Sequence, residues 1–367
     1  MLEFDTTRQG VPDRDPMTAA WLSGILFLTL TVWISAKGET AKYVLYTLPF
    51  TMTLAYAVVN RWELKLHMPA LWGFLLYMAL AVGGMIANSW YDFNAYRDVA
   101  IVGGYLLLFV PWFRAPSWSA DLALGAIAVG LVVEAATEGI ADKIDLFGSD
   151  GILESTLAFP LGAVVIYYAH SGRWGRVLLA SVLLFLSFKR IAFLGVAVAI
   201  GFDMVLARYL RLGAARIIAL ASVAVLSLLA LFSTQIFEYV TTALSYEQTS
   251  ADSISLGRYA IAVRLWSELE IVSWMSWLIG SGPGSADALV AANFQLVNPH
   301  NDWLKILYDY GVLGFIALHA IIYWTYREHR LALMLYLYTA IVMMTDNIFI
   351  YMFYHPFMMM MMSAARR

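Results

Sequence analysis

Cysteine is absent from the 367-residue sequence, and charged residues are scarce. Without cysteine the chain forms no disulfide, no thiolate metal site and no cysteine nucleophile. Charged residues make up 13% of the sequence, the net charge is −3, and no basic stripe is interleaved with aromatic residues. A nucleic-acid-binding surface is therefore not expected. The 6 histidines show no metal-ligand spacing, so we expect neither a metal ion nor a cofactor.

Hydrophobic residues are abundant instead, at 61% of the sequence. A soluble domain of this size does not need so much apolar surface, whereas an integral helical membrane protein does. The sequence therefore predicts an all-α, polytopic membrane protein. The residues before Met17 are polar and mixed in charge, and the apolar run 17–36 is too long for an ordinary signal-peptide core. We expect no cleavable signal peptide and interpret 17–36 as a first, uncleaved span.

Apolar runs long enough to cross about 30 Å of hydrocarbon predict about twelve membrane spans. Two divisions depend on polar residues inside a longer run. As one helix, 175–207 would be about 50 Å long and would place Lys189 and Arg190 near the bilayer centre, so a break there is favoured. Thr345-Asp346-Asn347 interrupts 331–365 in the same way. The expected spans are 17–36, 43–59, 68–86, 98–113, 120–136, 152–169, 175–188, 191–207, 215–233, 303–324, 331–347 and 348–365.

The distribution of Lys and Arg sets the expected orientation. With the N-terminus in the cytoplasm and the sides alternating, the cytoplasmic segments hold more basic residues than the outer ones. Both termini are therefore predicted inside. The chain then divides into an N-terminal transmembrane bundle of about nine spans (1–233), a large outer loop (234–302) and C-terminal helices of about three spans (303–367).

Lys189 and Arg190 run against this orientation, because they place positive charge at the outer end of a span. One interpretation is that both side chains snorkel to outer-leaflet phosphates. The other is an anion clamp, since a guanidinium group matches a phosphate with two parallel hydrogen bonds. The sequence leaves both open.

A second pair of basic residues lies in the outer loop. Arg258 and Arg264 share a segment of helical, amphipathic spacing, but six residues place them on different faces. Glu268 is placed to pair with Arg264 at i+4. We therefore favour Arg258 as the functional residue and Arg264 as a structural or supporting charge.

The loop ends in a glycine cluster and then a polar motif. Gly280-Ser281-Gly282-Pro283-Gly284 lacks the ending of a P-loop, and a plain turn is the simpler interpretation, although Gly282 could let the backbone approach a phosphate or sugar. In Pro299-His300-Asn301-Asp302, a helix N-terminus and nearby arginines would favour the neutral imidazole of His300, the form that accepts a proton. A helix cap is the alternative role. Asp302 is a candidate to orient the imidazole.

Three segments, in order, resemble the superfamily of O-antigen ligases and Wzy-type O-antigen polymerases. Ser187-Phe188-Lys189-Arg190-Ile191-Ala192 resembles its Ser-x-x-Arg segment at an outer span end. Gly257-Arg258, with Trp266 and the glycine cluster, resembles its large-loop motif. Pro299 to Leu304, with Gly311 and Gly314, resembles its His-Asn signature. The resemblance covers roughly residues 150 to 325, and Lys189 departs from the spacing typical of the ligases.

This resemblance implies a GT-C-like bacterial inner-membrane enzyme with a periplasmic loop and a periplasmic active site. The activity it implies is that of an inverting, metal-independent glycosyltransferase of polysaccharide assembly. Its donor would be a glycan on undecaprenyl diphosphate. Its acceptor would be lipid A–core in a ligase, or another lipid-linked glycan in a polymerase. The implied roles are general base for His300 and diphosphate binding for Arg190 and Arg258. Substrate-binding roles would fall to Lys189, Arg264, Asn301, Asp302 and Gly282.

Two other classes of function remain open at this stage. A transporter or flippase of lipid-linked oligosaccharide would also span the membrane, although charged residues near mid-membrane and inverted halves are typical of transporters and neither is evident. The other open class is a scaffold protein of envelope assembly. The choice between ligase and polymerase, the glycan, the oligomeric state and dependence on a chain-length regulator are not fixed by the sequence.

Overall fold

A computed structural model describes most of the chain. The described residues are 46–59, 67–108, 110, 118–138, 155–187, 189–207, 209–243, 258–271, 274–294, 299–326, 329–348, 351 and 354–365. Within these ranges every regular element is a helix and there is no strand, which confirms the all-α prediction. The expected span 17–36 lies outside the described residues.

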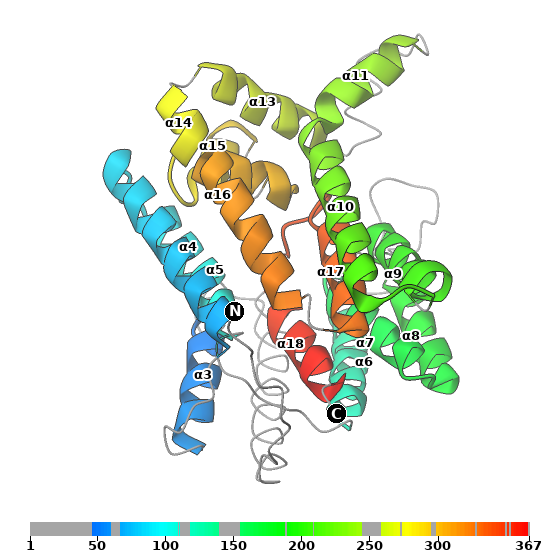
Figure 1. The fold of residues 1–367 in the computed structure, drawn as a ribbon. Helices are drawn as coiled ribbons and strands as arrows, with labels where there is room; N and C mark the ends of the chain where they lie inside the picture. The colour runs from blue at the N-terminus through cyan, green and yellow to red at the C-terminus, as the bar shows by residue number, and fades with distance from the viewer. Residues whose placement is uncertain are drawn as a thin grey trace.

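The helices pack into a bundle with a cap of shorter helices at one end (Figure 1). The bundle helices are α3 (Leu48–Val59), α4 (Met68–Ala87), α5 (Phe93–Leu108), α6 (Ser119–Glu138), α7 (Ala158–His170), α8 (Trp174–Leu186), α9 (Arg190–Phe202), the π-helical turn η1 (Asp203–Ala207), α10 (Leu212–Leu231), α16 (Asp302–Tyr326), α17 (Arg330–Val342) and α18 (Tyr354–Ala365). The cap holds α11 (Ser233–Ala243), α13 (Arg258–Ile271), α14 (Trp274–Ile279) and α15 (Ser285–Phe294). The expected outer loop therefore contains helices that apolar run length did not predict.

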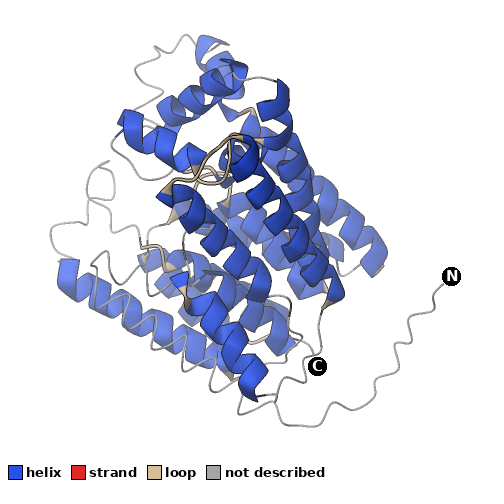
Figure 2. Cartoon of the chain, turned by 90° about the vertical axis from the view of Figure 1, so that its left-hand side faces the viewer, coloured by secondary structure: helices blue, strands red, loops and turns tan. Residues whose placement is uncertain are grey.

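The core of the bundle lies around α7 and α17, whose described side chains are almost all buried. α17 packs against α9, α10 and α7, and α18 packs against α7 and α6. Figure 2 shows the same packing from the side, with the bundle helices running in roughly one direction. Most of the side chains of α8 are exposed, and they are apolar, which is what contact with lipid requires.

Three helices are long and apolar enough to cross a membrane: Ala70–Ala87, Leu212–Leu231 and Asp302–Trp324. Four shorter helices, in α3, α7, α8 and α17, are also apolar. These helices support a membrane protein. The count of about twelve spans and the side on which the cap lies remain predictions.

The predicted break at Lys189 is present. α8 ends at Leu186 and α9 begins at Arg190, with Lys189 in an extended conformation between them (φ −84°, ψ 90°). The hydroxyl of Ser187 donates to the carbonyl of Leu184 at 2.6 Å and closes the last turn of α8. The polar residues of this segment thus interrupt an otherwise continuous apolar run, because burying them in a straight helix would be more costly.

α16 is bent, which the sequence did not predict. Gly311 has φ 63° and ψ −169° and joins two helical halves, 302–310 and 312–326. The ring centroids of Trp303 and His319 are 4.6 Å apart, whereas sixteen residues of continuous helix would separate them by about 24 Å. The first half therefore folds back along the second.

Glycines at 280 and 311 permit this bend. A Cβ on Gly311 would lie 2.5 Å from the backbone of Leu278 and Gly280. A Cβ on Gly280, which has φ +81°, would lie 2.2 Å from the carbonyl oxygen of Asp309. Only glycine combines a positive φ with so close a backbone approach. The glycine cluster and the glycine after Tyr310 thus form one packing contact, although about thirty residues separate them in the sequence.

Candidate functional site

The start of α16 is held between α10 and α17. The side-chain oxygen of Asn301 accepts from the backbone N–H of Leu304 at 3.1 Å and caps the helix, and its amide nitrogen donates to the carbonyl of Ala230 at 3.1 Å. The backbone N–H of Asp302 donates to the carbonyl of Met343 at 3.0 Å. Asn301 and Asp302 are both buried. The motif therefore serves a capping role, and it also fixes the position of the residue before it.

That residue, His300, has a left-handed backbone conformation, with φ 55°. A non-glycine residue in this region is uncommon, and such strain often occurs at functional sites because the surrounding structure maintains it. The side chain of His300 is half-buried, so a substrate can reach it. His300 directly precedes the capped start of α16, which is attached to α10 and α17. These attachments restrict the position of its backbone.

Lys189 forms a buried ion pair with Asp346, in the connection between α17 and α18. The ammonium nitrogen lies 3.1 Å from a carboxylate oxygen, and the two side chains are 9% and 1% exposed. The other oxygen of Asp346 accepts from the hydroxyl of Tyr351 at 2.8 Å and from the backbone N–H of Asn347 at 3.0 Å. Lys189 also lies 5.7 Å from the ring centroid of Phe159. The break between α8 and α9 is thus tied to the end of α17.

Arg190, the next residue, is exposed at the first position of α9. The two basic residues therefore differ in environment: Lys189 is committed to Asp346, whereas the guanidinium of Arg190 is accessible to a ligand. Snorkelling and an anion clamp both remain as interpretations of Arg190, whereas the ammonium of Lys189 is paired within the protein.

Tyr351 connects these groups to the cap. The carboxylates of Asp346 and Asp302 and the guanidinium of Arg258 all act on its phenol. The three charged groups act on one phenol, so they lie within electrostatic reach of it. Arg258 is the first residue of α13 and is half-buried. The Lys189–Asp346 pair therefore contacts Tyr351, and Arg258 and Asp302 lie within electrostatic reach of the same phenol; we call this set of residues the Tyr351 cluster.

Arg264 has a different position, between one and two helical turns further along α13. It pairs with Glu268 at 2.5 Å, and the two side chains are 43% and 25% exposed. This confirms the pairing that the i+4 spacing predicted. No described contact joins Arg264 to the Tyr351 cluster, so its substrate-binding role stays a prediction.

Gly282 lies at the opposite end of the first half of α16. Its backbone N–H donates to the carbonyl of Asp309 at 2.9 Å, and a Cβ there would lie 3.1 Å from the indole of Trp90. Asp309 is about two helical turns from Asp302. The structure therefore places Gly282 in packing contacts that position α15 and α16, and does not bring it to the start of α16.

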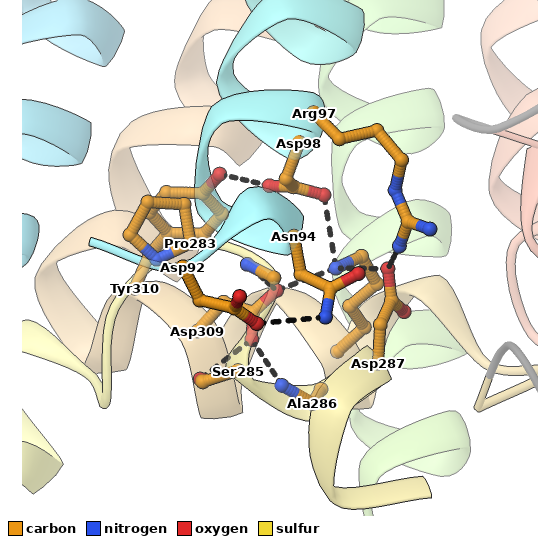
Figure 3. A network of polar contacts seen from close by, with 12 residues as sticks. Asp92, Asn94, Arg97, Asp98, Pro283, Ser285, Ala286, Asp287, Asp309 and Tyr310 are labelled. Atoms are coloured by element: carbon orange, nitrogen blue, oxygen red, sulfur yellow. Dashed lines mark hydrogen bonds and ion pairs between the residues drawn. The ribbon is translucent and has the colours of Figure 1, made fainter. Parts of the chain in front are cut away.

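A second polar site surrounds Lys305 (Figure 3). Its ammonium lies 2.6 Å from Asp309, 2.9 Å from Asp98 and 3.5 Å from Asp287. Asp287 also pairs with Arg97 at 2.6 Å. We call these five residues the Lys305 network. It joins α5, α15 and α16, and all three carboxylates are buried.

Hydrogen bonds complete the Lys305 network. The carboxylate of Asp309 accepts from the backbone N–H groups of Gly284 and Ala286 and from the hydroxyl of Ser285, so it caps α15 from a distant segment. Asp98 accepts from the hydroxyl of Tyr310, which in turn contacts the hydroxyl of Tyr77 at 2.8 Å. The network thus attaches the first half of α16 to the cap and to α4.

The charges of the Lys305 network are tightly coupled. Burial raises the pKa of Asp287, Lys305 lowers it, Asp98 raises it and Arg97 lowers it. The dominance of burial shows that the two cations offset the loss of hydration only in part. Among the described residues, no group of three or more His, Cys, Asp or Glu side chains is arranged to hold a metal ion.

Comparison with known proteins identifies a segment that includes Lys189, Arg258 and Asp302. Residues 176–319 match a family model described as O-antigen ligase. This confirms the resemblance to the ligase and Wzy-type superfamily, which implies a glycosyltransferase-type enzyme of lipopolysaccharide biosynthesis. No curated protein and no solved structure matches the chain at a significant level.

All of the predicted site residues, from Lys189 to Asp302, lie within the O-antigen ligase segment, but two partners lie outside it. Asp346 and Tyr351 follow α17, beyond the match. Asp346 entered the sequence-based prediction only as part of a polar interruption of an apolar run, and Tyr351 was not predicted. The polar interruption Thr345-Asp346-Asn347 was a usable signal, because three polar residues in an apolar run need partners.

Proposed function

We propose that this chain is an inverting, metal-independent glycosyltransferase that moves a glycan from undecaprenyl diphosphate to an acceptor sugar at the periplasmic face of the inner membrane. The observation that carries the proposal is the buried Lys189–Asp346 pair in contact with Tyr351, with Arg258 and Asp302 within electrostatic reach of the same phenol. His300 and Arg190 adjoin these residues in sequence, and the O-antigen ligase match covers both. The cytoplasmic location of both termini belongs to the same proposal.

Arg190 and Arg258 bind the diphosphate in this mechanism. When the bond to the donor sugar breaks, negative charge develops on the phosphate oxygen that had carried the sugar. Two guanidinium groups stabilise that charge without a metal ion, and in a partly dry site such stabilisation amounts to several kcal/mol. Lys189 adds positive potential nearby, although its ammonium is already paired with Asp346.

His300 acts as the general base. The acceptor hydroxyl oxygen attacks the anomeric carbon, the bond from that carbon to the diphosphate oxygen breaks, and the hydroxyl proton passes to the imidazole of His300. A positioned base contributes roughly 100- to 10,000-fold to such a step. A single displacement inverts the anomeric configuration. The strained backbone and the anchored helix start hold His300 in place for this transfer.

The acceptor is lipid A–core in a ligase or a second lipid-linked glycan in a polymerase. Both reactions need the same donor chemistry, so the Tyr351 cluster serves either. Membrane lipids surround the exposed apolar faces of the bundle, and the polyprenyl tail of the donor lies among them.

Reconstitution tests the proposal. Purified protein in liposomes receives a lipid-linked glycan donor, with lipid A–core and a second lipid-linked glycan as competing acceptors. The wild type is expected to transfer, and His300→Ala, Arg190→Ala and Arg258→Ala are each expected to lose at least about 100-fold in rate. Arg176→Ala is the matched control, because Arg176 pairs with Asp121 at 3.1 Å at the other end of α8. Normal donor consumption by His300→Ala would instead favour a transporter.

A further inference from the structure

The residues on either side of Asp346 carry polar atoms whose hydrogen-bonding capacity is not used. Asn347 is 1% exposed, and both the oxygen and the nitrogen of its amide are buried with no hydrogen-bond partner in the described part of the chain. The hydroxyl of Thr345 is likewise buried without a partner there. Asp346, between them, has its charge paired with Lys189. The connection between α17 and α18 therefore holds three unsatisfied polar atoms beside the Tyr351 cluster.

Such an arrangement is costly. A buried polar group without a partner loses its hydration and gains nothing, and native proteins retain few such groups. Asn301 provides the contrast within the same region, because its amide is also buried but both of its polar atoms are hydrogen-bonded. At Asn301 the fold provides protein partners for a buried amide. At Asn347 the described part of the chain provides none. A bound ligand would supply the missing partners.

The location fits a ligand of the same site. Asn347 donates its backbone N–H to Asp346, which pairs with Lys189 and accepts from Tyr351. The carbonyl of Met343, two residues before Thr345, accepts from Asp302 at the start of α16. The unsatisfied atoms thus belong to the turn that joins the two sides of the Tyr351 cluster.

We propose that Asn347 recognises a sugar of the lipid-linked glycan, with the hydroxyl of Thr345 as a second contact. This inference rests on the proposed function. The chemistry of the amide selects the group that it binds: it offers a donor and an acceptor together, as sugar hydroxyl and acetamido groups do, whereas a diphosphate only accepts. Arg190 and Arg258 bind the diphosphate, and Asn347 forms hydrogen bonds with the sugar attached to it.

Binding includes a local rearrangement. The amide atoms of Asn347 are shielded from solvent in the unliganded chain, so the turn 344–348 shifts when the sugar enters. A site built from buried hydrogen-bonding groups discriminates strongly, because an analogue that lacks the matching hydroxyl leaves those groups unpaired. Asn347 is therefore a specificity-determining residue, distinct in role from the base and from the diphosphate ligands.

Stability and activity should change in opposite directions on substitution. Asn347→Leu keeps the number of side-chain heavy atoms, and Thr345→Val keeps the shape, and both remove unsatisfied polar atoms. We expect their thermal transitions in detergent to be unchanged or raised by about 2–4 °C. We expect kcat/KM for the native lipid-linked glycan to fall by about 10- to 100-fold in Asn347→Leu. Asn301→Leu, which removes a satisfied amide, should lower the transition.

A second measurement isolates the sugar. Free undecaprenyl diphosphate, which carries no glycan, competes with the donor, and its inhibition constant reports the diphosphate site. This constant should be unchanged in Asn347→Leu and raised in Arg258→Ala. An equal rise in both variants would overturn the inference, because Asn347 would then bind the diphosphate.

Two other results would also overturn it. Lower thermal transitions in both Asn347→Leu and Thr345→Val would show that these atoms have partners in the fold. Wild-type kinetics in both variants would show that no sugar depends on them. The failure of the proposed function is distinguishable, because it would appear as a wild type that does not transfer the glycan, whereas failure of this inference leaves the wild type active.

Discussion

The indole of Trp303 lies against the imidazole of His319, with ring centroids 4.6 Å apart, although both residues belong to α16. The contact exists because α16 reverses direction at Gly311. As a result, the half-helix that begins with Asn301 and Asp302 is attached at both ends: to α10 and α17 at its start, and to the Lys305 network near its end. The position of His300 depends on both attachments.

Gly311→Ala should therefore disable the protein. Its Cβ would meet the backbone of Leu278 and Gly280 at 2.5 Å, and the positive φ alone costs about 1–2 kcal/mol for alanine. We expect a lower thermal transition and loss of glycan transfer. Gly83→Ala in α4 is the control, because a Cβ there meets nothing within 4 Å. Equal stability and activity of the two variants would contradict the role of the bend.

The buried pair of Lys189 and Asp346 should show strong coupling. Removal of one partner leaves a buried charge and typically costs 3–5 kcal/mol, roughly, whereas removal of both is far less harmful. Lys189→Met is thus expected to lower the thermal transition sharply, and Lys189→Met with Asp346→Asn to recover part of it. A double variant no more stable than Lys189→Met would show that the pair is not formed in the membrane.

The Lys305 network should be the most sensitive part of the cap. Among the described residues, Lys305→Met leaves the carboxylates of Asp98, Asp287 and Asp309 with Arg97 as the one paired countercharge. We expect a loss of roughly 3–5 kcal/mol, seen as a poor yield of folded protein and a lowered thermal transition. Addition of Asp98→Asn should restore part of the yield. Wild-type stability of Lys305→Met would contradict this account, because it would mean that the carboxylates do not depend on a charged Lys305.

Substitution of the two arginines of α13 should affect glycan transfer differently. Arg264→Ala breaks an exposed pair with Glu268, so we expect a change of at most about 1 kcal/mol in stability. Arg258→Ala should leave stability similarly unaffected but reduce glycan transfer by at least about 100-fold, because it removes a ligand of the leaving group. The rates of glycan transfer of the two variants should be measured in the same assay. Equal losses in Arg258→Ala and Arg264→Ala would show that Arg264 binds substrate as well.

The sequence predicted the helical class, most helix positions and the break at Lys189, because each depends on local hydropathy and on the cost of burying charge. It also predicted the pair of Arg264 and Glu268, which depends only on i+4 spacing. The family segment was recognisable because its three motifs occur in order. These features need no knowledge of which helices are neighbours.

The Lys305 network and the pair of Lys189 with Asp346 were not predictable in the same way. Asp98 meets Lys305 across more than two hundred residues, and Lys189 meets Asp346 across more than one hundred and fifty. Such pairing follows from the packing of the bundle, which hydropathy does not determine. The bend in α16 was missed for the same reason: Gly311 alone in an apolar run fits a straight helix, and its partner Gly280 lies on another element.

The central claim is that His300 acts on an acceptor next to a diphosphate held by Arg190 and Arg258. The most direct test is a single turnover of bound lipid-linked donor by His300→Ala, with donor affinity measured on the same sample. The account predicts wild-type donor affinity and a first turnover slowed by at least about 100-fold. A first turnover at the wild-type rate would contradict it.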